Sequence, residues 1–286
     1  MNKSSIFIDS DFDYKSYLKE FKLNELLGED FPSNDISSKN ILPEYLNVDE
    51  NYTVPFQTEY DDLIRLHFIC RLRKVSRVLE FGVGKSSVIF ADALRDNKAH
   101  YHDFSSKNLR GKNLYECHSI DNNQQWIEKC KKLMPKDFIK DGLIYFHQAK
   151  LITSLFNDRV CTFYDPVPNL CPDLIYLDGP DQFSPIGDIR GISTKHSDRM
   201  PMSADILSFE HFLQPGTLII VDGRTANARF LKSNFQRNWN YIYNEDWDQH
   251  FFELLEMPLG QYNKDMIDFN LGDDYYQRLN SLSEKL

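Results

Sequence analysis

Cysteine is scarce in this sequence, and its few residues follow no pairing or ligand pattern. Five cysteines are spread over 286 residues, and no two of them have the Cys-x-x-Cys spacing of many metal sites. An odd number of unpatterned cysteines is typical of free thiols in a reducing compartment rather than of a disulfide framework. We therefore expect a cytoplasmic protein without a cysteine-based zinc site.

Long apolar runs and an excess of positive charge are also missing. No apolar stretch approaches the roughly 18 residues that a membrane-spanning helix needs, and residues 1–13 lack the apolar core of a signal peptide. The net charge of -10 and the isoelectric point of about 5.3 give no overall attraction to nucleic acid. We expect a soluble chain that binds neither a membrane nor a nucleic acid.

Residues 77–87 are the most informative stretch, with the sequence Arg-Val-Leu-Glu-Phe-Gly-Val-Gly-Lys-Ser-Ser. Its apolar beginning is typical of a buried strand, and a helical apolar pattern starts after Ser86. Gly82 and Gly84 permit a tight turn and a close approach of a ligand to the backbone. A strand that passes through a glycine turn into a helix predicts a nucleotide-like ligand at the amino terminus of the helix.

Strands and helices are predicted to alternate along the central part of the chain. Seven strands are expected within residues 77–84, 114–120, 143–148, 173–177, 217–221, 239–243 and 251–257, and residues 160–164 are a candidate for a short extra one. Helices are expected at about 58–73, 85–95, 123–133, 204–213 and 225–236, with a polar loop at 96–113. The last two strands are too close in sequence for a crossover and should form an antiparallel hairpin. The predicted fold class is α/β: a doubly wound Rossmann-like sheet of seven strands, one of them antiparallel, with helices on both faces.

Polar residues stand at the carboxyl ends of five predicted strands. Open α/β sheets bind their ligands at these ends. The residues concerned are Glu80 with Gly82, then Asp121, Gln148, Asp178 and Asp222. Because all five strands end in polar residues, we predict a ligand site at this end of the sheet.

Three segments are expected: residues 1–55, a domain at 56–260 and a tail at 261–286. In the first, apolar residues at helical spacing predict one amphipathic helix over about 14–27, ended by Gly28. This segment is interpreted as a cap on the main domain; the other interpretations are a substrate lid and a contact in a homodimer. The tail is acidic and aromatic and is expected to be peripheral.

With these residues in place, the sequence resembles the class I S-adenosylmethionine-dependent methyltransferases over about residues 58–257. The matching features are Glu-Phe-Gly-Val-Gly at 80–84, which is similar to the E/D-x-G-x-G loop of that family, Asp121, Asp178 and the terminal hairpin. Asp-Gly-Pro-Asp at 178–181 and Val-Asp-Gly-Arg at 221–224 further resemble sugar or small-molecule O-methyltransferases. The resemblance implies S-adenosylmethionine as cofactor and a small-molecule or glycan acceptor.

The resemblance also implies which residues hold the methyl donor. The glycine turn would contact its amino-acid end, and Glu80 would lie near its ammonium, in contact with it directly or through water. Asp121 would accept hydrogen bonds from its ribose hydroxyls. The full set of cofactor-binding candidates is Glu80, Gly82, Gly84, Ser86, Asp121, Asn122 and Gln148. The family often has an acidic residue where this sequence has Gln148, so the adenine contact departs from the family pattern.

Methyl transfer to a hydroxyl requires alignment of donor and acceptor and removal of a proton. Asp178 is the first candidate for the catalytic base, and His196, in a long polar loop at 181–203, is the second. Some related O-methyltransferases bind a divalent cation, and Asp178 and Asp222 match the positions of its ligands, which makes Mg²⁺ a further candidate cofactor. Gly223 follows Asp222 where the family's catechol-type members have asparagine, so one expected ligand is missing.

Other classes of protein match the glycine turn less well. A P-loop would need glycine where this chain has Leu79, and a nicotinamide dehydrogenase would need a third glycine where it has Ser87. A third alternative is a methyltransferase-like interaction domain without activity. The retained Glu80, Gly82 and Asp121 argue against it, because a scaffold has no need of a donor pocket.

Overall fold

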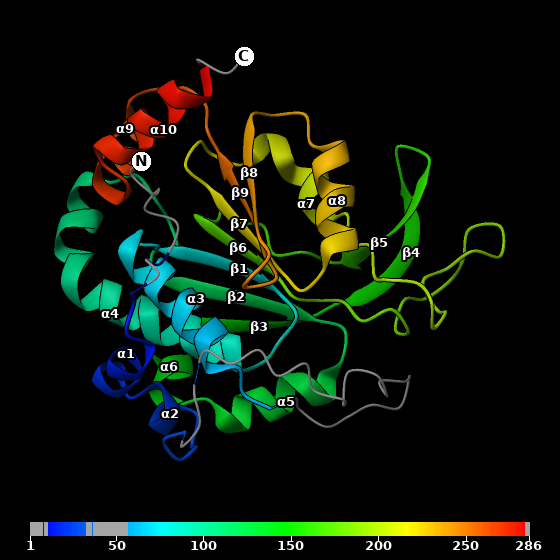
Figure 1. Cartoon of the computed structure of the whole chain (residues 1–286), viewed down its shortest axis with the longest axis horizontal. Coiled ribbons are helices and arrows are strands. Elements are labelled where there is room, and N and C mark those ends of the chain that lie inside the picture. Colours follow the sequence, from blue (N-terminus) through cyan, green and yellow to red (C-terminus); the bar gives the residue numbers. More distant parts are fainter. Residues whose placement is uncertain (1–7, 9–10, 33–35, 37–56, 284–286) are drawn as a thin grey trace.

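The computed structural model describes residue 8, residues 11–32, residue 36 and residues 57–283. A seven-stranded sheet lies at its centre, in the order β3-β2-β1-β6-β7-β9-β8 (Figure 1). β9 runs antiparallel to both of its neighbours, β7 and β8, and the other six strands share one direction. The strands are β1 Arg77–Phe81, β2 Glu116–Asp121, β3 Ile144–Gln148, β6 Leu174–Leu177, β7 Leu218–Asp222, β8 Trp239–Asn244 and β9 Gln249–Leu254. The predicted fold class is confirmed.

Alternate side chains of the buried strands enter two separate apolar layers. In β1, Val78 packs into the layer on one face of the sheet and Leu79 into the layer on the other. The central strands β1, β6 and β7 are buried on both faces almost throughout, as expected for strands that are covered on both sides. Helices α3 (Tyr60–Leu72) and α4 (Lys85–Asn108) cover the first face, and α7 (Asp205–Phe209) and α8 (Thr225–Asn234) cover the second (Figure 1).

The helix after the glycine turn is longer than predicted. It extends to Asn108, so the expected polar loop at 96–113 is mostly helical. The chain contains neither glycine nor proline between Gly84 and Gly111, so nothing stops the helix early. Its second half is polar because it lies on the surface, with Ser105 among its few buried residues. Two short helices follow β2, α5 Gln124–Leu133 and α6 Lys136–Lys140.

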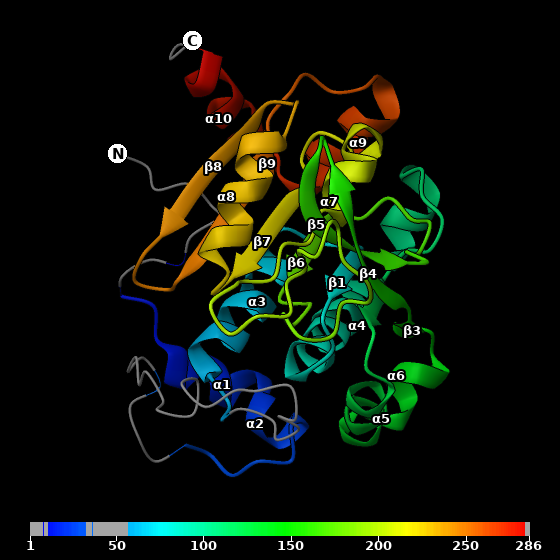
Figure 2. The same ribbon diagram turned by 90° about the vertical axis from the view of Figure 1, so that its right-hand side faces the viewer.

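A separate two-stranded sheet follows β3 and contains the predicted extra strand. β4 (Lys150–Phe156) and β5 (Arg159–Asp165) form this antiparallel hairpin, which stands beside the main sheet (Figures 1 and 2). The sequence analysis predicted only part of β5 and missed β4. The expected helix at 204–213 is the short α7 followed by a 3-10 turn, Glu210–Phe212.

The described part of the amino-terminal segment packs against α3. The predicted helix over 14–27 is divided into α1 (Tyr14–Phe21) and α2 (Leu23–Leu26), because Lys22 between them adopts a left-handed conformation with φ 51°. Leu18 and Leu23 are fully buried, and the Tyr17 hydroxyl lies 2.8 Å from Nδ1 of the buried His67. Most of the remainder of the predicted segment 1–55 lies outside the described residues.

The carboxyl-terminal segment is less peripheral than predicted. It forms α9 (Gln261–Asn270) and α10 (Asp273–Ser283). Tyr275 is fully buried, and Arg278 of α10 binds the buried Glu253 of β9 at 2.8 Å. Among the helices in the described ranges, none has the length and apolar character needed to cross a membrane.

Candidate active site

The glycine turn is held between the ends of two neighbouring strands. The Gly82 N–H donates to the Ile120 carbonyl at 2.9 Å. On the other side, a Cβ on Gly82 would lie 3.0 Å from the Gly179 nitrogen, and Gly82 has a φ of +99° that favours glycine. A Cβ on Gly84 would meet only Ser86 Oγ, at 3.9 Å, so a ligand has room to approach the backbone there.

Glu80 lies beneath the turn and is fully buried. Ser86 and Ser87, at the start of α4, donate to its two carboxylate oxygens at 2.5 Å, and Ser119 of β2 also donates to it. Burial raises the pKa of Glu80 to about 7, although the three hydroxyl donors oppose the shift. Glu80 therefore joins β1, β2 and α4 at the site.

This geometry changes the interpretation of two predicted cofactor residues. Both oxygens of Glu80 already accept hydrogen bonds from hydroxyls, so its contact with a donor ammonium stays a prediction. The Ser86 side chain is nearly buried and faces Glu80, so its hydroxyl supports the turn from within. A ligand contact by Ser86 would have to involve its backbone.

Asp121 connects the end of β2 to the glycine turn. Its Oδ2 accepts a hydrogen bond from the Val83 N–H at 3.0 Å, and its Oδ1 accepts one from the Asn123 N–H at 2.7 Å. Burial raises the pKa of Asp121 to about 6, and the two backbone donors oppose the shift. Each oxygen keeps a second lone pair, so the carboxylate can still accept hydrogen bonds from a diol.

The other predicted adenosine contacts lie beside Asp121. Gln148 is its partner in the parallel pairing of β2 with β3, and its side chain is exposed. Asn122 is partly exposed and follows Asp121 in the chain. The structure thus brings the glycine turn, Asp121, Asn122 and Gln148 together at one edge of the sheet, while their contacts with a cofactor remain predictions.

Arg224 organises the other half of the site, and the sequence analysis gave it no role. Its Nη1 donates to the Pro180 carbonyl at 2.6 Å, its Nη2 donates to the Asp178 carbonyl, and its Nε lies 3.5 Å from Asp178 Oδ1. The side chain of Asp178 remains 51% exposed. Arg224 follows β7, and Asp178 follows the adjacent parallel strand β6. A prediction that these two strands are neighbours would have indicated the pairing of the two residues.

Asp178 and Asp222 are electrostatically coupled across the two strand ends. Burial raises the pKa of Asp222 to about 7, and the charge of Asp178 adds to the shift. Tyr176 donates to Asp222 Oδ2 at 2.7 Å. The pKa of Asp178 is raised as well, because protein atoms crowd its half-exposed carboxyl group, whereas Arg224 opposes the shift. The guanidinium therefore favours the ionised form of Asp178.

The side chains around these two acids do not fit a divalent cation. Within the described residues, no group of three or more histidine, cysteine, aspartate or glutamate side chains could hold a metal ion. Asp178 already has the Arg224 guanidinium beside it, and Asp222 accepts a hydrogen bond from Tyr176. The predicted magnesium site is therefore not supported, because a cationic group of the protein lies where the metal would bind.

The predicted second catalytic residue, His196, faces its own loop. Its Nδ1 accepts a hydrogen bond from the Asp198 N–H at 3.1 Å, and half of the side chain is exposed. The loop joins the β4–β5 hairpin through bridges from Ile186 to Ile152 and from Ser203 to Thr162. These contacts give His196 no link to Asp178, and its catalytic role remains a prediction.

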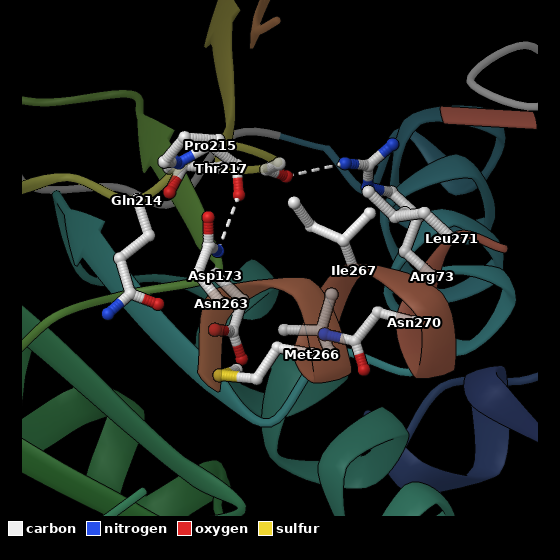
Figure 3. Close-up of a pocket in the computed structure, with 12 residues that line it drawn as sticks. Arg73, Asp173, Gln214, Pro215, Thr217, Asn263, Met266, Ile267, Asn270 and Leu271 are labelled. Atoms are coloured by element: carbon white, nitrogen blue, oxygen red, sulfur yellow. Dashed lines mark hydrogen bonds between the residues drawn. The ribbon is translucent and has the colours of Figure 1, made fainter. Parts of the chain in front are cut away.

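A small pocket lies at the opposite edge of the sheet, near the starts of β6 and β7 (Figure 3). There Arg73 donates to the Gly216 carbonyl at 2.8 Å, and Asn263 of α9 donates to the Pro215 carbonyl at 3.1 Å. The Asn263 contact holds α9 against the loop before β7, and the Arg73 contact joins the end of α3 to the same loop. Because ligands of doubly wound sheets bind at the carboxyl ends of the strands, this pocket is not the candidate active site.

The chain is only distantly similar to known proteins. No protein-family model and no curated protein sequence matches the chain. Among solved structures, it is similar to the SAH-bound methyltransferase PaMTH1 of Podospora anserina, with a TM-score of 0.41 and 12% identity, over 87% of this chain and 100% of that one. The SAM complex of the O-methyltransferase TomG of Streptomyces achromogenes gives a TM-score of 0.37 and 12% identity, over 87% and 92%. An SAH complex of an O-methyltransferase of Bacillus cereus gives 0.38 and 9%, over 85% and 100%. At these values the likeness assigns no activity, so the function must be argued from the residues of the site.

Proposed function

We propose that the chain is an S-adenosylmethionine-dependent methyltransferase that methylates a hydroxyl group of a sugar or another small molecule. The observation that carries the proposal is the hydrogen bond between Asp121 and the Val83 N–H. It joins the diol-binding candidate to the glycine turn, so that one ligand could contact both. This arrangement suits the ribose and the amino-acid end of an adenosyl donor.

The pairing of Lys85, the cation that follows the glycine turn, also agrees with a donor that has no phosphates. Lys85, which follows Gly84, is paired with Glu29 at 2.9 Å. A P-loop lysine would instead point toward phosphate groups. The missing P-loop glycine at Leu79 agrees with this interpretation.

The residues of the chain would position the acceptor and remove its proton. S-adenosylmethionine supplies an electrophilic methyl group when it is bound. The exposed carboxylate of Asp178 would accept the proton of the acceptor hydroxyl as the new O–CH₃ bond forms. Arg224 holds the Asp178 carbonyl and side chain in place and favours the ionised form of that side chain.

Calorimetry with S-adenosylmethionine, S-adenosylhomocysteine, NAD and ATP tests the donor. Binding of the two adenosyl sulfur compounds is expected. Asp121→Ala should weaken it by about 1.5–3 kcal/mol, or roughly 10- to 150-fold, because charge-assisted hydrogen bonds are lost. Binding of NAD or ATP with no response to either sulfur compound would contradict the proposal.

A turnover assay with a panel of alcohols, sugars and phenols tests the chemistry. Asp178→Asn should keep donor affinity and lose most of the turnover, because the amide cannot accept the proton. An equal loss of both properties would place Asp178 in the donor site instead. Donor binding without turnover on any acceptor would favour the interaction domain.

A further inference from the structure

One glutamate of the amino-terminal segment, Glu29, binds the cation that follows the glycine turn. Glu29 follows α2, and its carboxylate is 31% exposed. It accepts hydrogen bonds from the Thr58 hydroxyl and the Tyr60 hydroxyl, each at 2.6 Å, and pairs with Lys85 at 2.9 Å. Lys85 Nζ also donates to Thr58 Oγ1, so the four side chains form one cluster.

The cluster lies at the start of α4, next to the glycine turn. Lys85 is the first residue of α4 and follows Gly84 directly. Thr58 and Tyr60 flank Glu59, whose negative charge raises the pKa of Asp178. The Glu29 cluster thus joins the chain at 58–60 to Lys85, the residue that follows the glycine turn.

Anchoring of the segment does not by itself require these contacts. Leu18, Leu23 and Leu27 are buried in the main core, and Tyr17 binds His67. An ion pair as exposed as that of Glu29 with Lys85 contributes little to stability as a rule. Yet the pKa of Glu29 is lowered, because its hydrogen bonds to Thr58, Tyr60 and Lys85 outweigh the opposing effect of burial. The lowered pKa keeps the Glu29 carboxylate ionised, and Lys85 is the cation that pairs with it.

The position of the Lys85 ammonium affects which ligand charges the glycine turn can bind. Free to turn toward the glycine turn, its ammonium would repel a cationic donor and attract phosphate groups. S-adenosylmethionine carries one positive charge more than S-adenosylhomocysteine, because only the former has a sulfonium. A displaced Lys85 would therefore penalise the first ligand more than the second.

We propose that Glu29 is a specificity-determining positioning residue, which holds Lys85 away from the glycine turn and so adapts the turn to a cationic, phosphate-free donor. The inference rests on the proposed function. Glu29 itself does not touch the donor. It acts by forming an ion pair with Lys85 and accepting a hydrogen bond from Thr58.

Calorimetry of the full chain with S-adenosylmethionine, S-adenosylhomocysteine and inorganic triphosphate tests this inference. In Glu29→Gln, the ratio of affinities for the two adenosyl compounds should shift against S-adenosylmethionine by about tenfold, and triphosphate binding should become stronger. Adding Lys85→Met should restore the ratio, because the released cation is removed. A loss caused only by damaged structure would not be repaired by a second substitution.

Glu25→Gln is the matched control, since Glu25 is an exposed glutamate of α2 that pairs with Lys22 at 3.8 Å. It should leave the ratio unchanged. If Glu29→Gln does not fold, Thr58→Val, which loosens both Glu29 and Lys85, should shift the ratio in the same direction. An unchanged ratio in the folded variants, with wild-type affinity intact, overturns the inference and leaves the proposed function standing. Failure of the wild type to bind either adenosyl compound overturns the proposed function itself.

Discussion

Replacing Glu80 by glutamine probes the buried carboxyl beneath the glycine turn. The pKa of Glu80 is raised from 4.5 to about 7 by complete burial. Between these values the folded chain holds a proton that the unfolded chain has lost, so this group favours folding below pH 4.5 and loses that contribution as the pH rises through about 7. The shift of about 2.5 pH units corresponds to roughly 3 kcal/mol of stability.

Glutamine removes the titration while it keeps the size of the side chain. Its amide retains one acceptor oxygen, and its nitrogen can donate to a serine hydroxyl that rotates. The free energy of unfolding of Glu80→Gln minus that of the wild type should therefore increase by roughly 3 kcal/mol from about pH 4.5 to about pH 7.5. Urea unfolding followed by circular dichroism at several pH values measures this difference.

The exposed Glu25 again provides the control, because Glu25→Gln should give a difference that hardly varies over this range. If the difference in free energy of unfolding between Glu80→Gln and the wild type is also independent of pH, the pKa of Glu80 is not raised and the account of this buried carboxyl is wrong.

The same carboxyl gives a test of the predicted ammonium contact. A cationic donor close to Glu80 would favour its ionised form, so binding near pH 6 should release a fraction of a proton. Calorimetry in two buffers with different ionisation enthalpies detects this release, and Glu80→Gln should reduce it to the part that comes from Asp121, whose pKa of about 6 lies in the same range. Equal binding enthalpies in both buffers would show that the donor does not interact with Glu80.

Two further predictions concern the loop after β6 and the acids beside it. Gly179→Ala would place a Cβ 2.8 Å from the Gly82 nitrogen and force the two loops apart, so unfolding in urea should show a loss of roughly 1–3 kcal/mol; a neutral substitution would contradict the close packing. A chelator should leave methyl transfer unchanged, because Arg224 lies beside Asp178 where a metal would bind. Loss of turnover on addition of EDTA, with recovery on addition of Mg²⁺, would show that this reasoning is wrong.

Local patterns predicted the elements that depend on neighbours in the sequence. Apolar and alternating stretches identified all seven strands of the main sheet within a few residues, because strands that line a core carry apolar side chains at regular positions. The short connection between the last two strands identified the hairpin. The length of α4 was underestimated because its second half is exposed and has no apolar face to reveal it.

The sequence by itself therefore determined the class of the sheet and the residues at its carboxyl ends, including Glu80, Asp121 and Asp178. Only the tertiary structure decided what these residues contact. Ser119 reaches Glu80 from 39 positions away in the chain, and Arg224 reaches Asp178 from 46 positions away. Such pairs form because packing places the ends of neighbouring strands side by side, and no local periodicity encodes that distance.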